Sequence, residues 1–373
     1  MSTPRIEVDL HKIRQNTQTV MKRLAARGIG TTGVTKAVCG HPAIAQAMLD
    51  GGASGLADAR LINVQELRKA GISGPITLIR TPMLSQADQV VQVCEASYNT
   101  EMAVIAALAA AAIQNDKVHD VILMVEMGDL REGIMPEHLA AMSQQVMEMP
   151  GVALEGIAAN FACLNSAAPD AAEMTAFSDL VSETEAKCGT SLQTVSGGNS
   201  ANLPWAFGGH STGRINDLRL GEAILLGVDP VSGNPIAGMY DDAFVLVAEI
   251  IETDTKPAPH PVNSADPALV KRRSAPPCKD ATRLILAIGH QDTDIQGLSM
   301  PAGNVFIGAT SDHLVLATNL PTLGVGAEMR FQVNYSALMH AMAAPDVNTT
   351  LLCDQTSPQT RGAKTASKRL ALI

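Results

Sequence analysis

From residue 11 to about residue 230, short apolar and β-branched runs alternate with longer segments whose apolar residues recur at helical spacing. The strand-like runs are TTGVTK (31–36), GLADA (55–59), ITLIRT (76–81), ASYN (96–99), VILMVEM (121–127), LEGIAANF (154–161), QTVSGG (193–198) and LRLGEAI (218–224). Several helical segments between them end in glycine, as helices commonly do. Eight units of strand then helix favour a parallel (β/α)8 barrel, and an open doubly wound sheet is the alternative.

The pattern changes after residue 230, where β-rich segments follow one another with few helical stretches. We therefore predict an α/β fold in which a (β/α)8 TIM barrel (1–230) precedes a smaller, mostly-β domain (231–345) and a C-terminal extension (346–373). The run IEVDL (6–10) also resembles a strand but lies outside the eight barrel units, so it is a candidate strand of the β-domain sheet. The Pro-rich, charged stretch 256–277 is expected to form an exposed loop.

Composition and charge indicate which kinds of molecule the protein is not expected to bind. The 373 residues include 37 Asp and Glu against 27 Lys and Arg, and the resulting net charge of -10 disfavours nucleic acid and anionic membrane surfaces. The Ala-rich run 102–113 is too short to span a bilayer, and the N-terminal segment has no signal-peptide core. The six cysteines form no CxxC pair, which argues against zinc and against a disulfide framework. We expect a cytoplasmic protein that binds a small molecule but no metal, nucleic acid or membrane.

The carboxyl ends of the predicted strands carry the candidate chemistry, because these ends meet at one mouth of a barrel. The residues expected there are Lys36, Asp58, Arg80, Asn99, Glu126 to Arg131, Asn160, Gly197 to Ser200, and Arg219 to Glu222. A lysine, arginines and a Gly-Gly-Asn-Ser turn suit an anionic, phosphorylated ligand that bears a carbonyl group. On position alone, Lys36 is either a solvated cation at a strand end or a nucleophile.

Nine segments in order resemble the landmarks of the alanine racemase family, whose members bind pyridoxal phosphate (PLP) in a barrel followed by a β-domain. They are IEVDLHKIRQNT, GVTKAVCGH, MVEMGDLREGI, EGIAANFA, SGGNSA, LRLGEAILLG, LILAIGHQD, GATSDHLVLA and VNYSALMHAM. Within that family, the sequence is most similar to the ornithine racemase-like branch. The resemblance covers the chain to about residue 346.

The resemblance implies a PLP-dependent racemase that removes and returns the α-proton of an amino acid. Lys36 would form the Schiff base with PLP and then act as the base on one face, and partial burial beside other cations would lower its pKa. Arg219 would face the pyridine nitrogen as an obligate donor, or else form a salt bridge at the mouth. Arg131 would contact the cofactor or the substrate carboxylate, or else pair with Glu132.

The resemblance also implies further cofactor-binding positions. They are Asn160, Asn199, Ser200, Gly221, Glu222 and Tyr335. Ser200, Gly221 and Tyr335 match family positions around the phosphate, although Tyr335 also fits an ordinary core tyrosine. Asn160 stands where alanine racemases usually carry a histidine, and Met124 stands where some relatives carry a lysine that becomes carbamylated.

The second catalytic group is where the sequence departs from the family. Alanine racemases take a tyrosine from the partner subunit's β-domain, and the resemblance places that region in the loop 256–277, which contains no tyrosine. His290 is the first candidate for this group, ahead of Asp292, Asp312 and Cys39, and Asp312 is also a candidate substrate contact. His290, Asp292 and Asp312 lie in segments that resemble the part of the β-domain that reaches across a homodimer, whereas Cys39 closely follows Lys36.

The substrate implied by the branch is ornithine or another basic amino acid. Its distal ammonium group calls for a carboxylate, and Asp129, Glu222 and Asp292 are the candidates. Three alternatives stay open: an alanine or broad-specificity racemase, a non-catalytic PLP-binding protein, and a Schiff-base aldolase without PLP.

Overall fold

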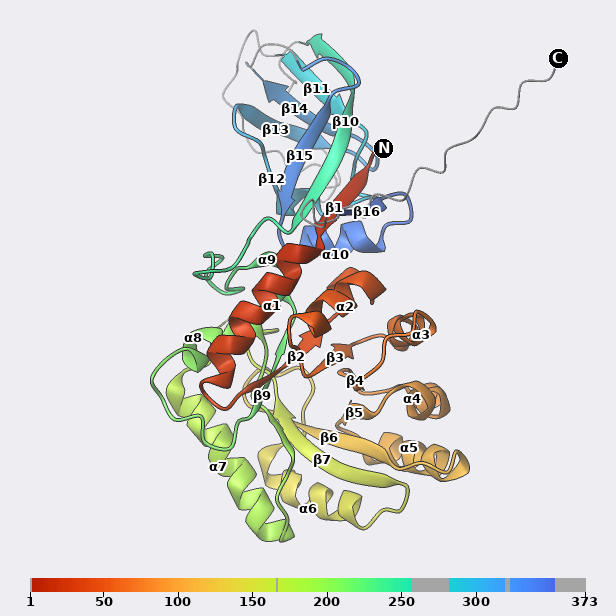
Figure 1. Cartoon of the computed structure of the whole chain (residues 1–373), viewed down its shortest axis with the longest axis vertical. Coiled ribbons are helices and arrows are strands. Elements are labelled where there is room, and N and C mark those ends of the chain that lie inside the picture. Colours follow the sequence, from red (N-terminus) through yellow and green to blue (C-terminus); the bar gives the residue numbers. More distant parts are fainter. Residues whose placement is uncertain (1, 166, 257–281, 319–322, 353–373) are drawn as a thin grey trace, which may run out of the picture.

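The structure is a computed structural model that describes residues 2–165, 167–256, 282–318 and 323–352. The middle of the chain forms a barrel, and both ends of the described chain contribute to a β-domain beside it (Figure 1). The loop expected at 256–277 falls outside the described residues beyond its first residue, as does the tail after Leu352. Within the described ranges, no helix is both long and apolar enough to cross a membrane.

Eight parallel strands close into a barrel in sequence order. They are β2 (Gly30–Val34), β3 (Gly55–Asp58), β4 (Ile76–Leu78), β5 (Ala96–Asn99), β6 (His119–Val125), β7 (Val152–Ala159), β8 (Thr194–Ser196) and β9 (Asp217–Leu220). The barrel is closed because β2 pairs with β9 as well as with β3. The predicted (β/α)8 barrel is therefore confirmed, and the open sheet is excluded.

Helices surround the barrel on its outer side (Figure 1). They are α1 (Leu10–Ala25), α2 (Pro42–Asp50), α3 (Leu61–Lys69), α4 (Ala87–Val93), α5 (Met102–Gln114), α6 (Pro136–Met147), α7 (Ala171–Cys188), α8 (Leu203–Ala206) and α9 (Glu222–Leu226). Local sequence explains where α7 begins and ends, since Asp170 and Glu173 form a capping box and Gly189 takes a left-handed conformation after the last turn. Short 3-10 helices η1 (Lys36–Val38), η2 (Leu84–Gln86) and η3 (Ser200–Asn202) follow β2, β4 and β8.

The barrel strands are buried on both faces, which explains their nearly continuous apolar sequences. Val121 and Leu123 of β6 belong to the large core that the helices cover. Ile122 and Met124 alternate with them and belong to a second, smaller cluster with Tyr98. Alternate side chains of a strand point to opposite faces, so this second cluster fills the inside of the barrel.

Seven of the eight barrel strands end one to four residues earlier than the sequence predicts, and β5 ends where expected. The run 218–224 divides at Gly221, because β9 stops at Leu220 and α9 begins at Glu222. A short apolar run fits a buried strand and a buried helix equally well, so periodicity does not separate them. The strand β8 stops at Ser196, and the two glycines after it turn the chain, with Gly198 at φ +125°.

The β-domain is a mostly antiparallel sheet with the strand order β12-β15-β10-β11-β14-β13. These strands are β10 (Phe244–Thr255), β11 (Thr282–Leu286), β12 (Leu298–Ser299), β13 (Asn304–Ala309), β14 (Leu314–Thr318) and β15 (Glu328–Val333), with η4 (Ile295–Gly297) before β12. The predicted mostly-β second domain is thus confirmed.

The two ends of the described chain join this sheet. β1 (Arg5–Asp9) pairs antiparallel with β10, and β16 (Asn348–Leu352) pairs in parallel with β1. Residues 348–352 therefore belong to the sheet, although the sequence predicts that they lie in an extension. A strand whose partner among the described residues is at the other end of the chain has no local signal of its pairing.

The helix α10 (Tyr335–Ala343) connects the two domains, and it lies between the barrel and the sheet in Figure 1. It packs against η1, which directly follows the first barrel strand. On the other side, Thr293 Oγ1 donates a hydrogen bond to Ala337 O at 3.0 Å. The β-domain is thus held beside the carboxyl end of the barrel, where the mouth lies.

Candidate active site

The barrel mouth gathers most of the residues that the sequence singles out. Five neighbouring strands, β6, β7, β8, β9 and β2, present them at their carboxyl ends, and α10 adds Tyr335. From the strand ends come Arg131, Asn160, Asn199, Ser200, Arg219, Gly221, Glu222 and Lys36. Active sites of barrel enzymes are built from these ends.

Lys36 begins the tight turn that follows β2. A Cβ at Gly40 in this turn would lie 2.7 Å from Cβ of Asn63, so only glycine fits there. Lys36 is exposed, and its Nζ has no hydrogen-bond or ion-pair partner within the described chain. The partial burial that we expected is not found, because the lysine stands on a turn at the mouth and not inside the strand.

Asp58, at the end of β3, holds this turn in place through hydrogen bonds. Its carboxylate is fully buried and accepts hydrogen bonds from Thr35 Oγ1 at 2.7 Å, from Arg60 N at 2.8 Å and from Asn63 Nδ2 at 2.9 Å. Burial raises the pKa of Asp58 above its ordinary value. Because all its partners lie in the loops after β2 and β3 or at the start of α3, Asp58 fixes the turn that carries Lys36.

Glu222 and Tyr335 face the same mouth. Burial raises the pKa of Glu222 to about 7, with a further contribution from Asp229, while the positive charge of Lys36 opposes the shift. Burial also raises the pKa of Tyr335, and the negative charge of Glu222 adds to that effect. No described residue forms a hydrogen bond or ion pair with the Glu222 carboxylate, so it is free to bind a cation.

Arg219 is 5 % exposed and lies inside the mouth. Its Nη1 donates to Ser196 Oγ at 2.7 Å, and its Nη2 donates to Ala159 O at 2.8 Å. The guanidinium carbon lies 5.2 Å from the centre of the Tyr98 ring. Arg219 forms no ion pair with any described residue, which weighs against the alternative of a salt bridge. Its hydrogen-bond partners are neutral acceptors.

The loops after β8 and β9 approach each other closely around Ser200. The Ser200 Oγ accepts a hydrogen bond from Ala223 N at 3.2 Å, and a Cβ added at Gly221 would lie 3.3 Å from Val34. Asn199 Oδ1 accepts from Ala201 N at 2.8 Å. Small residues in such a turn let the backbone approach a ligand closely, which suits an anion.

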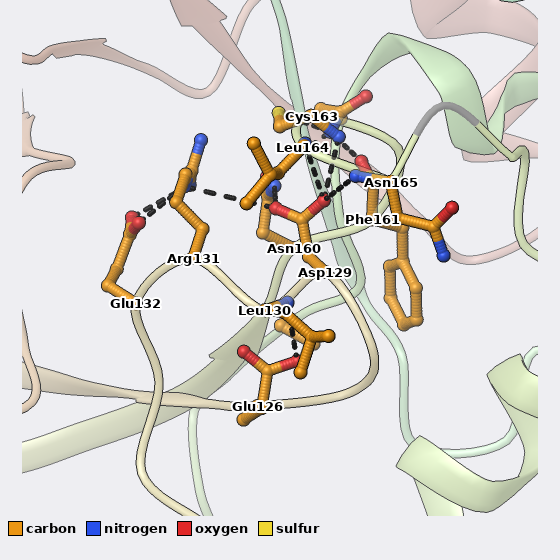
Figure 2. A network of polar contacts seen from close by, with 12 residues as sticks. Glu126, Asp129, Leu130, Arg131, Glu132, Asn160, Phe161, Cys163, Leu164 and Asn165 are labelled. Atoms are coloured by element: carbon orange, nitrogen blue, oxygen red, sulfur yellow. Dashed lines mark hydrogen bonds and ion pairs between the residues drawn. The ribbon is translucent and has the colours of Figure 1, made fainter.

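The loop after β6 places Arg131 beside two acids (Figure 2). Its Nη2 donates to Glu132 Oε1 at 2.7 Å, and its Nε lies 3.9 Å from Asp129 Oδ2. The pairing with Glu132, which was the alternative for Arg131, is therefore present. The Arg131 side chain remains 37 % exposed and can still reach a ligand.

Asn160 lies in the middle of a polar chain. Its Nδ2 donates to Asp129 Oδ2 at 2.8 Å, while its Oδ1 accepts from Asn199 Nδ2 at 3.2 Å and from Arg219 Nη2 at 3.5 Å. The chain thus connects the loops after β6, β7 and β8 with the strand β9. Met124, by contrast, is buried inside the barrel in the cluster that contains Tyr98.

The structure places His290, Asp292 and Asp312 in neighbouring turns of the β-domain. His290 N donates to Thr310 O at 3.0 Å, and Asp292 accepts from Gly289 N at 2.8 Å. Burial raises the pKa of Asp292, and the negative charges of Asp346 and Asp312 add to the shift. No hydrogen bond or ion pair of these three side chains reaches the barrel within the described ranges.

The buried residues Ser196 and Tyr98 and the half-buried Asp217 lie beneath Arg219, and none of them was singled out from the sequence. Ser196 Oγ donates to Asp217, whose other oxygen accepts from Thr32 Oγ1 at 2.9 Å, and Tyr98 lies near the guanidinium. Burial raises the pKa of Asp217, although the hydrogen bond from Ser196 and the charge of Arg219 lower it. The sequence does contain a sign of such residues, because a polar residue inside a short apolar strand usually has a buried hydrogen-bond partner.

Comparison with known proteins gives one consistent result. The family "Alanine racemase, N-terminal domain" matches residues 8–229. A lysine racemase from Thermotoga maritima is 31% identical over 349 residues, which are 93% of this chain and 98% of that protein. An ornithine racemase from Acetoanaerobium sticklandii is 31% identical over 357 residues, covering 94% of this chain and 99% of that protein.

The fold agrees with these relatives. The crystal structure of alanine racemase from a D-cycloserine-producing Streptomyces lavendulae superimposes with a TM-score of 0.75 at 20% identity, covering 95% of this chain and 98% of that one. Barrel, β-domain and sequence thus lead to one assignment. The chain belongs to the alanine racemase family.

Proposed function

We propose that this racemase binds pyridoxal phosphate at the barrel mouth through Lys36 and acts on ornithine, lysine or another basic amino acid. The chain is an amino-acid racemase, since two curated racemases match it over more than nine-tenths of its length. The observation that carries the cofactor proposal is the unpaired Lys36 amine, within the described chain, next to an anion cradle and a buried, unneutralised arginine.

The residues at the mouth fit this cofactor. Lys36 can hold it covalently, the turn of Asn199 and Ser200 with Gly221 suits its phosphate, and Tyr335 and Asn160 complete the pocket. Arg219 can only donate a hydrogen bond, so it would keep the pyridine nitrogen unprotonated. When bound, the cofactor supplies an electron-withdrawing ring that stabilises the negative charge left by removal of the α-proton.

The chain's own groups then move and direct the proton. Lys36 would act as the base on one face of the α-carbon. For the other face we propose His290, or else Asp292, from a second copy of the chain, because their contacts within one chain stay in the β-domain. The proposal therefore includes a homodimer whose active sites lie at the subunit interface, where Arg131 and Asp312 would contact the substrate.

Glu222 is our preferred partner for the distal ammonium group. Asp129 accepts four hydrogen bonds, from three backbone amides and Asn160, and has no free oxygen to offer. Asp292 is already the second choice, after His290, for the group on the other face of the α-carbon. Glu222 is the candidate that combines a free carboxylate, among the described residues, with a position near Lys36.

We also propose that the protein works in the cytoplasm. Cys39, Cys94, Cys163 and Cys188 are all free thiols in the described chain, which suits a reducing compartment.

Replacing Lys36 by alanine tests the cofactor proposal. We expect loss of the visible absorbance of bound pyridoxal phosphate and a fall of at least about 1,000-fold in racemase activity, because tether and base are both removed. The matched control is Lys69→Ala, an exposed lysine that pairs with Glu66 on α3. Absorbance and turnover that survive in Lys36→Ala would contradict the proposal.

The pH dependence of substrate preference tests Glu222. This carboxylic acid loses its proton as the pH rises through about 7, so its attraction for a distal ammonium group should appear between about pH 6 and pH 8. We expect the ratio of kcat/KM for ornithine to that for alanine to rise about tenfold over this range. In Glu222→Gln the ratio should stay flat, and an equal rise in that variant would exclude Glu222.

Deuterium exchange at the α-carbon tests His290. Replacing His290 by asparagine should slow racemisation by about 100-fold or more, because one acid/base group is lost. Exchange into the enantiomer whose α-proton faces Lys36 should continue. His138→Asn is the control, since His138 is an exposed histidine on α6, outside the barrel. Wild-type racemisation in His290→Asn would show that another residue serves the second face.

A further inference from the structure

Asp129 is a heavily hydrogen-bonded side chain at the mouth, although it lies in a loop. Its exposed fraction is 4 %, while the adjacent Leu130 is 76 % exposed. Oδ1 accepts from the backbone amides of Cys163, Leu164 and Asn165 at 2.9, 2.8 and 3.3 Å. Figure 2 shows Asp129 on the loop that carries Arg131, with its side chain against the loop of these three residues.

The carboxylate is ionised at neutral pH. Burial alone would raise the pKa of Asp129, but the hydrogen bonds from Leu164 N, Asn160 and Asn165 N lower it below its ordinary value. A buried charge of this kind is stable only when its oxygens are satisfied, and here they are.

The two loops that Asp129 joins are conformationally strained. Leu130 has a φ of +53° and Ala162 a φ of +58°, both in the left-handed region that non-glycine residues rarely adopt. Glu126 Oε1 also holds the first loop by accepting from Gly128 N at 2.6 Å and Leu130 N at 3.0 Å. Strain of this kind persists only where surrounding contacts impose it, and it is concentrated at functional sites.

Asp129 also determines which way the Asn160 amide points. The side-chain amide of Asn160 has a donor, Nδ2, and an acceptor, Oδ1. Its Nδ2 donates a hydrogen bond to Asp129 Oδ2 at 2.8 Å. On the far side, Asn199 presents only a donor, because its Oδ1 accepts from Ala201 N and its Nδ2 donates to Phe161 O at 2.7 Å. An acceptor on one side and a donor on the other allow a single orientation of Asn160.

We propose that Asp129 is a positioning residue, which fixes the Asn160 amide so that its oxygen faces Arg219 and which clamps the loop 163–165 to the mouth. Arg219 then receives a neutral acceptor from Asn160, 3.5 Å from Nη2, and keeps its full positive charge. A carboxylate in direct contact would neutralise it instead. The part that concerns Arg219 and the cofactor rests on the proposed function, whereas the clamp does not.

A swap of the two side chains tests the orientation. In Asp129→Asn, the amide oxygen introduced at position 129 can still accept hydrogen bonds from the three backbone amides. Its NH2 group, however, faces Asn160 Nδ2, so two donors meet. Asn160 must then turn over and point its own donor toward Asn199 and Arg219. Adding Asn160→Asp restores an acceptor for the amide introduced at position 129, and also for Asn199 and Arg219. Asn160→Asp alone places two carboxylates against each other.

Two readouts are needed, one with cofactor and one without. We expect the dissociation constant for pyridoxal phosphate, from spectroscopic titration, to rise about tenfold in Asp129→Asn and in Asn160→Asp, and to stay raised in the double variant, because Asn160→Asp places a carboxylate against Arg219. In the cofactor-free protein, Tm should fall in each single variant and recover in the double variant. Asp170→Asn, which removes the N-cap carboxylate of α7, is the control for cofactor binding.

Amide exchange tests the clamp directly. In Asp129→Ala, hydrogen exchange at the amides of 163–165 should accelerate at least about tenfold in the cofactor-free protein, while Asp129→Asn should keep most of the protection. The inference is overturned if the double variant is no better than the single ones in Tm, or if Asp129→Ala leaves this exchange unchanged. Wild-type protein that binds no pyridoxal phosphate would refute the proposed function, and Tm and exchange would still decide the role of Asp129.

Discussion

Closure of the barrel between β2 and β9 is the constraint on which the whole site depends. The register that pairs Thr32 with Arg219 and Gly33 with Leu220 brings the first and last barrel strands side by side. Because all eight strands run in the same direction, the turn with Lys36 and the loop with Glu222 emerge at the same end. No local interaction could bring these distant parts of the chain together.

Around that mouth, the polar residues are held by buried groups. Asp58 fixes the turn of Lys36, and Asp129 bonds to the amide of Asn160. Ser196 and Tyr98 support Arg219 from inside the barrel. Each of these candidate site residues is thus paired with a buried side chain that orients it or its turn, and such support limits the motion of a site before any ligand binds.

The alternation of strands and helices was enough to predict the barrel, because parallel strands buried on both faces have strong apolar runs. It was not enough to predict where each strand ends, since LRLGEAI is compatible with a strand and with a helix. In the structure the chain turns at Gly221, between β9 and α9. The family resemblance pointed to Lys36 and Arg219. It did not indicate the hydrogen bonds of Asp129, because a carboxylate in a loop carries no sign of the four donors that surround it in three dimensions.

The central claim is that the amine of Lys36 holds the cofactor. Reduction of the purified holoenzyme with borohydride, followed by protease digestion and peptide mass mapping, tests it most directly, because the reduced link survives digestion. The account predicts a pyridoxyl-phosphate mass increase on the peptide that contains Lys36. A modification on another lysine, or none in a protein that retains full racemase activity, would contradict it.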